Sequence, residues 1–239
     1  VSYTIRRFKE KPGPGEIFSN LASTGIYVCS PDIFSFIPPD TKFDFARDLF
    51  PLLMAEGHRL QAWLARGNWT DVGSPASLRQ AQRWKLDELS FSSFMGDISI
   101  TGGQITGPVM FGTAVTIGRN CRITGPVAIG SGTSIENDVL IGPYTSIGEN
   151  CTIRSRAKIF SSHIHNGVTL GRDSTASGSI IDNGTRIGEF CSVENDTVIG
   201  PRVEIRDRSV IHSKTRIWPD VVVPKESVVS EHLLNDNYD

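Results

Sequence analysis

This sequence lacks long apolar runs, paired metal-binding cysteines and any strong excess of charge of one sign. No apolar stretch approaches the roughly 18 residues of a membrane-spanning helix, which argues against a membrane protein. Lys and Arg total 24 against 26 Asp and Glu, so no basic surface for nucleic acid is indicated. The first residues show no signal-peptide pattern, and we therefore expect a cytoplasmic protein.

The four cysteines include no C-x-x-C pair, which disfavours a zinc or dithiol redox site. Cys121, Cys151 and Cys191 take the same position in a repeat described below, and we expect them to be buried as small apolar residues. Cys29 lies in an apolar segment and is expected to pack as well.

A six-residue repeat dominates the sequence from Ile105 to Val229. An apolar residue recurs at every sixth position, first in Ile105, Phe111, Ile117, Ile123, Ile129, Ile135, Ile141, Ile147, Ile153 and Ile159, then in Ile181, Ile187, Val193, Ile199, Ile205, Ile211, Ile217, Val223 and Val229. Two positions earlier stands a smaller residue in most cases, and alternation along a strand turns both side chains the same way. This period is typical of a left-handed parallel β-helix, in which each hexapeptide forms one short strand and one corner.

The repeat predicts a β-helix of roughly seven coils over residues 98–229. Its step of six is lost between Ile159 and Ile181, and such a slip predicts a protruding corner or a local bulge. The period stops after Val229, so residues 230–239 are expected to form a polar C-terminal tail.

Residues 1–86 lack the repeat and read as the end of an α/β domain, followed by a linker at residues 87–97. Strands are expected at Ser2–Phe8, Gly25–Cys29 and Leu60–Leu64, and helical segments at Pro31–Phe36, Phe45–Met54 and from Pro75, with Ser74 as N-cap, to about Leu86. Because Val1 is not a Met and the first residues already alternate as in a strand, we expect the chain to be the second half of a longer protein.

Three short motifs in this part resemble the C-terminal half of sugar-1-phosphate nucleotidylyltransferases. They are Phe8–Pro12 (FKEKP), Ser19–Tyr27 (SNLASTGIY) and Trp69–Pro75 (WTDVGSP), in this order and followed by hexapeptides. Within that family the chain is most similar to bacterial or archaeal mannose-1-phosphate guanylyltransferases, and glucose-1-phosphate enzymes are close competitors. The resemblance implies an enzyme that joins a sugar 1-phosphate to a nucleoside triphosphate, with GDP-mannose as the favoured product.

The same resemblance implies a role for individual residues of the sugar site. Lys11 would bind the phosphate of the sugar 1-phosphate, and Glu10 would hydrogen-bond the sugar hydroxyls. Asn20 and the backbone at Gly25 would shape the sugar pocket. Asp44 stands where the family often places an acidic sugar contact.

Asp71, in the third motif, would be a ligand of Mg²⁺ near the nucleotide phosphates, facing the same cleft as Lys11. The reaction brings two anions together, and a Lys about 4 Å from a phosphate contributes about 4 kcal/mol at an effective dielectric of about 20. Mg²⁺ prefers carboxylate oxygens and neutralises phosphate charge, so positioning and electrostatics account for most of the catalysis. The glycine-rich loop that cradles the triphosphate in the family is absent, so we expect this chain alone to be inactive.

Two other functions fit a hexapeptide protein. Some β-helices are acyltransferases that use acetyl-CoA and a His as general base, a role open to His163 or His165. Others are non-catalytic assembly or regulatory subunits, and flat faces of the β-helix are expected to support homo-oligomers in either case. The presence of both Lys11 and Asp71 in their motifs favours the catalytic family.

Overall fold

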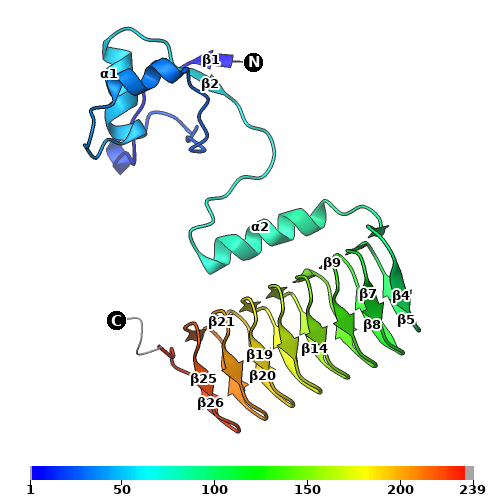
Figure 1. The fold of residues 1–239 in the computed structure, drawn as a ribbon. Coiled ribbons are helices and arrows are strands. Elements are labelled where there is room, and N and C mark those ends of the chain that lie inside the picture. Colours follow the sequence, from blue (N-terminus) through cyan, green and yellow to red (C-terminus); the bar gives the residue numbers. More distant parts are fainter. Residues whose placement is uncertain (1, 235–239) are drawn as a thin grey trace. The chain divides into compact units, whose positions relative to one another are not determined.

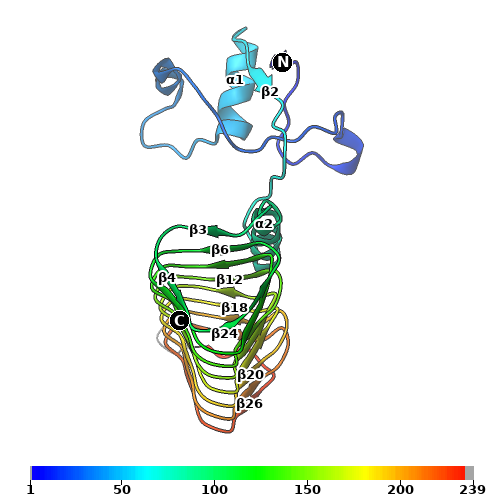
Figure 2. The ribbon, with the colours of Figure 1, turned by 90° about the vertical axis from the view of Figure 1, so that its right-hand side faces the viewer.

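The computed structural model describes residues 2–234 and divides into two compact units, the first ending at Trp69 and the second beginning at Thr70. The second unit is a parallel β-helix with one helix, α2, Pro75–Asp87, lying along it (Figure 1). Viewed along its axis, the β-helix has three flat walls (Figure 2). The hexapeptide prediction of a parallel β-helix is therefore confirmed.

Each wall is an eight-stranded parallel sheet, named here after its first strand. The β3 sheet contains β3 Ser93–Phe94, β6 Val109–Phe111, β9 Val127–Ile129, β12 Thr145–Ile147, β15 His163–Ile164, β18 Ile180–Ile181, β21 Val198–Ile199 and β24 Arg216–Ile217. The β4 sheet contains β4 Ile98–Ile100, β7 Val115–Ile117, β10 Ser134–Ile135, β13 Thr152–Ile153, β16 Thr169–Leu170, β19 Arg186–Ile187, β22 Glu204–Ile205 and β25 Val222–Val223. The β5 sheet contains β5 Gly103–Thr106, β8 Cys121–Thr124, β11 Leu140–Ile141, β14 Lys158–Phe160, β17 Thr175–Ser177, β20 Ser192–Val193, β23 Val210–Ile211 and β26 Val228–Val229.

The core of the β-helix consists of the two inward positions of each hexapeptide. Large aliphatic residues stack in register on successive coils, as Ile117 pairs with Ile135 and Ile135 with Ile153. The smaller positions before them are also buried, and Cys121, Cys151 and Cys191 are among them as expected. Alternation along each strand, with the outer residue facing solvent, explains why both inward positions of the repeat reach one narrow core.

Two corners of the β-helix differ from the predicted bulge. Between β14 and β15, and again between β17 and β18, the step from one inward residue to the next is five residues, as from Ile159 to Ile164 and from Ala176 to Ile181. The prediction of a protruding corner was wrong, because each of these corners loses a residue instead of gaining one. Parallel pairing continues through both corners, with Phe160 opposite Ser177.

The β-helix has eight coils where roughly seven were expected, because it begins earlier than the repeat suggests. β3 lies within the predicted linker, and its Phe94 stacks on Phe111 of the next coil with ring centroids 5.4 Å apart. At the other end Leu233 forms a parallel bridge with Ile217, so part of the expected tail continues the coil. The rest of that tail, residues 235–239, lies outside the described residues, as does Val1.

Helix α2 begins where it was predicted but belongs to the second unit. Ser74 caps it by accepting a hydrogen bond from the Ser77 amide at 3.1 Å. Gln82 and Leu86 are buried, and Gln82 donates hydrogen bonds to Ser146 and Ser162 of the β-helix. The packing of α2 on the β-helix explains why the compact units divide at Trp69 rather than at residue 86. No helix among residues 2–234 is long and apolar enough to cross a membrane.

The first unit contains little regular structure. Its elements are β1 Ser2–Thr4, η1 Pro14–Glu16, η2 Pro31–Phe36, η3 Phe45–Leu49, α1 Phe50–Ala55 and β2 Gln61–Trp63. β1 and β2 form an antiparallel pair, and the helical segments at residues 31–36 and 45–55 agree with the prediction.

The predicted buried strand at residues 25–29 is not present in the structure. Val28 is 100% exposed, and Cys29 is exposed rather than packed. A strand needs a hydrogen-bonded neighbour, and the two-stranded sheet of this unit pairs β1 only with β2.

Candidate functional site

Lys11 lies in a short loop of the first unit that is closed by local polar contacts. Lys9 forms an ion pair with Glu16, and the second carboxylate oxygen of Glu16 accepts the Gly13 amide at 3.0 Å. Lys11 itself has a positive φ of 44°, is exposed, and forms no ion pair among the described residues. The loop thus presents the ammonium group of Lys11 to solvent, while the neighbouring Glu10 is half-buried.

An aromatic cluster brings together segments that are distant in the sequence. Tyr27, from the second motif, stacks on Phe45 with ring centroids 5.9 Å apart and contacts Phe50 edge-on at 4.8 Å. Phe8, from the first motif, contacts Phe50 at 5.3 Å. The cluster therefore holds the first motif, the second motif and the segment of Asp44 in one unit, which the sequence motifs alone did not indicate.

Asp44 is the N-cap of η3, a role that the sequence comparison with the family did not predict. One of its carboxylate oxygens accepts the amides of Ala46 and Arg47, each at 2.8 Å. The Arg47 amide is the main cause that lowers the pKa of Asp44, and the positive charge of Lys11 acts in the same direction. The carboxylate is thus charged and exposed, and Lys11 is near enough to affect it.

Asn20 and Gly25 lie on the exposed second motif. Gly25 has a φ of +75°, a conformation that side chains rarely adopt, and its amide donates to the Ser23 hydroxyl at 3.2 Å. That hydroxyl also lies 3.1 Å from the hydroxyl of Tyr27. Gly25 is therefore required by the local turn, and Tyr27 anchors that turn to the aromatic cluster.

Asp71 is the first acidic residue of the second unit. Its side chain is exposed and has no hydrogen-bond or ion-pair partner among residues 2–234. Both carboxylate oxygens are thus available to a cation. Lys11 belongs to the other unit, so the shared cleft of Lys11 and Asp71 stays a prediction.

His163 and His165 lie side by side, with ring centroids 4.6 Å apart. Nδ1 of His163 is 2.8 Å from the hydroxyl of Ser146. The same hydroxyl accepts a hydrogen bond of 3.0 Å from Nε2 of Gln82 in α2. Burial lowers the pKa of His163 to about 4, and the charge of His165 acts in the same direction. A pKa of about 4 makes His163 a weak base, and its Nδ1 is already engaged by Ser146, so neither property favours a role as general base.

His165 has an acidic neighbour that sequence order concealed. Its Nδ1 lies 3.5 Å from the carboxylate of Asp182, on the next coil. The nearest acidic residue in sequence, Asp173, instead binds Arg156 through two hydrogen bonds of 2.7 Å. One turn of the β-helix separates His165 from Asp182, and contacts of this kind follow from the length of a coil rather than from proximity in sequence.

Two family models match the chain. A model described as nucleotidyl transferase matches residues 2–88, and a model described as the GMPPB C-terminal domain matches residues 123–234. The first match includes Glu10, Lys11, Asn20, Gly25, Asp44 and Asp71. The second covers most of the β-helix.

Three relatives illustrate the range of similar proteins. A probable mannose-1-phosphate guanylyltransferase 3 of Oryza sativa is 28% identical over 96% of this chain and 55% of its own length. A UTP–glucose-1-phosphate uridylyltransferase of Synechocystis is 34% identical over 70% of this chain and 42% of its length. A glucose-1-phosphate adenylyltransferase of Desulfitobacterium hafniense is 28% identical over 90% and 56%. The chain thus spans about half the length of the curated relatives it matches.

Among solved structures, a putative acetyltransferase of Bacillus cereus aligns with 58% of this chain and 74% of its own chain at 18% identity. The TM-score of 0.27 is too low to support any argument about function.

Proposed function

Since the chain belongs to the sugar-1-phosphate nucleotidyltransferase family, we propose that it is part of an enzyme that makes a nucleoside-diphosphate sugar and releases pyrophosphate. The observation that carries this proposal is the match of residues 2–88, which include every predicted site residue. GDP-mannose is the favoured product in the proposal. The match of residues 123–234 to the GMPPB C-terminal domain and three guanylyltransferase relatives support it.

In this proposal the residues of the first unit bind the sugar 1-phosphate. Lys11 is exposed and has no ion-pair partner within residues 2–234, so its ammonium group is accessible to a phosphate. Two anionic substrates must approach each other, and a fixed ammonium group lowers the repulsion between them. Glu10 and Asp44 supply carboxylates for sugar hydroxyls, although Asp44 already caps η3 through one oxygen.

The donor chemistry of Asp71 fits Mg²⁺. Mg²⁺ is commonly held by one or two carboxylates together with waters and substrate phosphates, so a single free carboxylate is a suitable protein ligand. Residues 2–234 contain no group of three or more His, Cys, Asp or Glu side chains that could hold a metal by themselves. When bound, the ion would neutralise charge on the nucleotide phosphates, and Asp71 would keep it next to them.

The sugar-phosphate role of Lys11 is tested in the full-length enzyme with Lys11→Ala. We expect KM for the sugar 1-phosphate to rise about tenfold or more while nucleotide binding is retained. Lys42→Ala removes another exposed lysine of the same unit and serves as the matched control. Equal kinetics for the two variants would remove Lys11 from the site.

The metal role is tested by titrating Mg²⁺ against Asp71→Asn, which keeps the shape and removes the charge. We expect half-maximal activity to require more Mg²⁺ than in the unsubstituted enzyme. An unaltered metal dependence would exclude Asp71 as a ligand. Asp32→Asn is a suitable control, because Asp32 is exposed and its carboxylate is bound by Ser30.

The identity of the product is tested by comparing GTP with mannose 1-phosphate against UTP or ATP with glucose 1-phosphate. A higher kcat/KM for either glucose pair would replace GDP-mannose in the proposal and leave the reaction class intact. The β-helix is proposed to support homo-oligomers through its flat walls, which light scattering of the full-length protein would measure.

A further inference from the structure

A charged groove runs along the corner between the β4 sheet and the β5 sheet, far along the β-helix from β3. It has a volume of ≈ 590 Å³, and its lining residues include Arg154, Arg186, Arg206 and Lys225. None of these residues belongs to the motifs of the proposed catalytic site. Grooves of this size, several hundred cubic ångströms, are typical of small-molecule sites.

The groove is open because two glycines interrupt a row of large side chains. Arg154 and Arg206 occupy the same corner position on coils three apart, a separation of about 14 Å at the usual strand spacing. Gly171 and Gly188 fill that position on the two coils between them. A Cβ on Gly171 would lie 2.1 Å from the carbonyl oxygen of Gly188, so the coils are too close there for any side chain.

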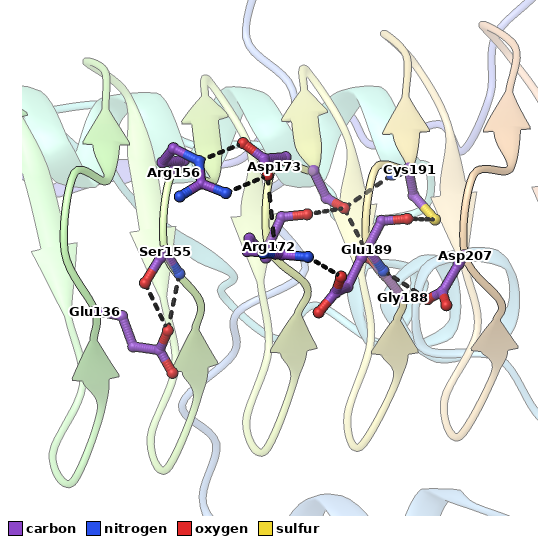
Figure 3. A network of polar contacts seen from close by, with 10 residues as sticks. Glu136, Ser155, Arg156, Arg172, Asp173, Gly188, Glu189, Cys191 and Asp207 are labelled. Atoms are coloured by element: carbon purple, nitrogen blue, oxygen red, sulfur yellow. Dashed lines mark hydrogen bonds and ion pairs between the residues drawn. The ribbon is translucent and has the colours of Figure 1, made fainter.

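The acidic residues of the groove are already engaged by other groups. Glu204 accepts a hydrogen bond of 2.8 Å from Nε of Arg206. Glu189 accepts a hydrogen bond of 2.8 Å from the guanidinium group of Arg172. Asp207 accepts the backbone amide of Glu189 at 2.8 Å. Figure 3 shows Glu189 bound to Arg172 and Asp207 on adjacent coils.

The basic residues are less well neutralised. Arg186 and Lys225 are exposed and form no hydrogen bond or ion pair through their side chains within the described part of the chain. Arg154 is 3.6 Å from Glu136, but the other oxygen of that carboxylate is bound by the amide and hydroxyl of Ser155 (Figure 3). The groove therefore keeps at least two cationic groups without a carboxylate partner.

We propose that this groove binds a small anion that carries phosphate groups, with Arg186 as its principal contact and Lys225 and Arg154 as further donors. A guanidinium group can donate two parallel hydrogen bonds to a phosphate, which suits the exposed Arg186 of the groove lining. Thr169, one coil away on the same face, adds a hydroxyl donor. The volume of ≈ 590 Å³ suits a small molecule, whereas an acidic peptide would need a longer cationic surface.

The proposal is tested by calorimetric titration of the 239-residue chain with inorganic pyrophosphate at low ionic strength, where charge interactions are strongest. Arg186→Ala is expected to raise Kd about tenfold or more, and Arg186→Lys to raise it less. Arg122→Ala is the matched control, since Arg122 is an exposed arginine on the β5 sheet outside the groove. Lys225→Gln provides a second variant of the groove itself.

Lys11→Ala separates this site from the proposed catalytic one, because pyrophosphate is also a product of the proposed reaction. Binding that survives Lys11→Ala and is lost in Arg186→Ala supports the groove. Equal affinities of Arg186→Ala and Arg122→Ala, or no binding by the unsubstituted chain, would overturn the proposal. Binding of a poly-glutamate peptide in place of pyrophosphate would overturn the assignment to a small molecule.

Discussion

Acidification is expected to destabilise the contact between α2 and the β-helix through His163. Gln82 of α2 donates to the hydroxyl of Ser146 at 3.0 Å and to the carbonyl of Ser162 at 3.2 Å. Nδ1 of His163 shares that hydroxyl at 2.8 Å. A proton on His163 would place a charge beneath the helix and would leave both ring nitrogens able only to donate, so Nδ1 could no longer accept a hydrogen bond from the Ser146 hydroxyl.

The sign and size of the effect follow from the pKa of His163. Burial lowers this pKa from 6.5 to about 4, so the unfolded chain takes up the proton before the folded one does. Stability is therefore fully present above about pH 6.5 and is lost as the pH falls toward about pH 4. At about 1.4 kcal/mol per pKa unit, the loss reaches about 3 kcal/mol at most.

The assay is urea unfolding followed by circular dichroism at about pH 7 and about pH 4.5, for the unsubstituted chain and His163→Asn. Protonation of carboxylates lowers the free energy of unfolding of both proteins, so the difference between their pH dependences gives the contribution of His163. We expect the unsubstituted chain to lose about 2 kcal/mol more than His163→Asn over this range. Hydrogen exchange of the α2 amides reports whether the loss is local to the helix.

His58→Asn is the control, because the His58 side chain is 52% exposed and lies in the other unit. It should follow the pH dependence of the unsubstituted chain. Parallel pH profiles for His163→Asn and the unsubstituted chain would refute the reasoning, since His163 would then not change its proton affinity on folding.

Two further predictions concern the core. Ile159→Ala removes a fully buried side chain from a narrow stack and should cost about 2–5 kcal/mol of unfolding free energy, whereas Leu140→Ala on the outer side of the same wall should cost much less. Equal changes in the urea midpoint would show that Ile159 is not tightly packed. In thiol labelling, the exposed Cys29 should react with iodoacetamide in the folded protein, while Cys151, whose pKa is raised by burial, should react only after unfolding. Mass spectrometry of the labelled peptides distinguishes the two, and simultaneous labelling would contradict the buried position of Cys151.

The β-helix was predictable from sequence because its periodicity is local. Every hexapeptide repeats the same two inward positions, so the burial of residues such as Val139 and Ile141 can be predicted without knowledge of distant parts of the chain. The N-cap of α2 was predictable for the same reason, since Ser74 and Pro75 act within one turn of helix. The segment at residues 25–29 failed because an apolar run becomes a strand only where another strand is available to pair with it.

By itself, the sequence determined the coil repeat, the burial of three cysteines and the motifs that indicate a nucleotidyltransferase, because all of these depend on nearest neighbours along the chain. Only the tertiary structure decided which residues meet across coils. It placed His165 beside Asp182 and Gln82 within hydrogen-bonding distance of Ser146. It also brought Arg154, Arg186 and Lys225, from different coils, into one groove. The physical reason is that these partners are not neighbours along the chain. One full turn of the β-helix, 17 residues, separates His165 from Asp182, and 64 residues separate Gln82 from Ser146. The shortened corners determine which residues of successive coils face each other.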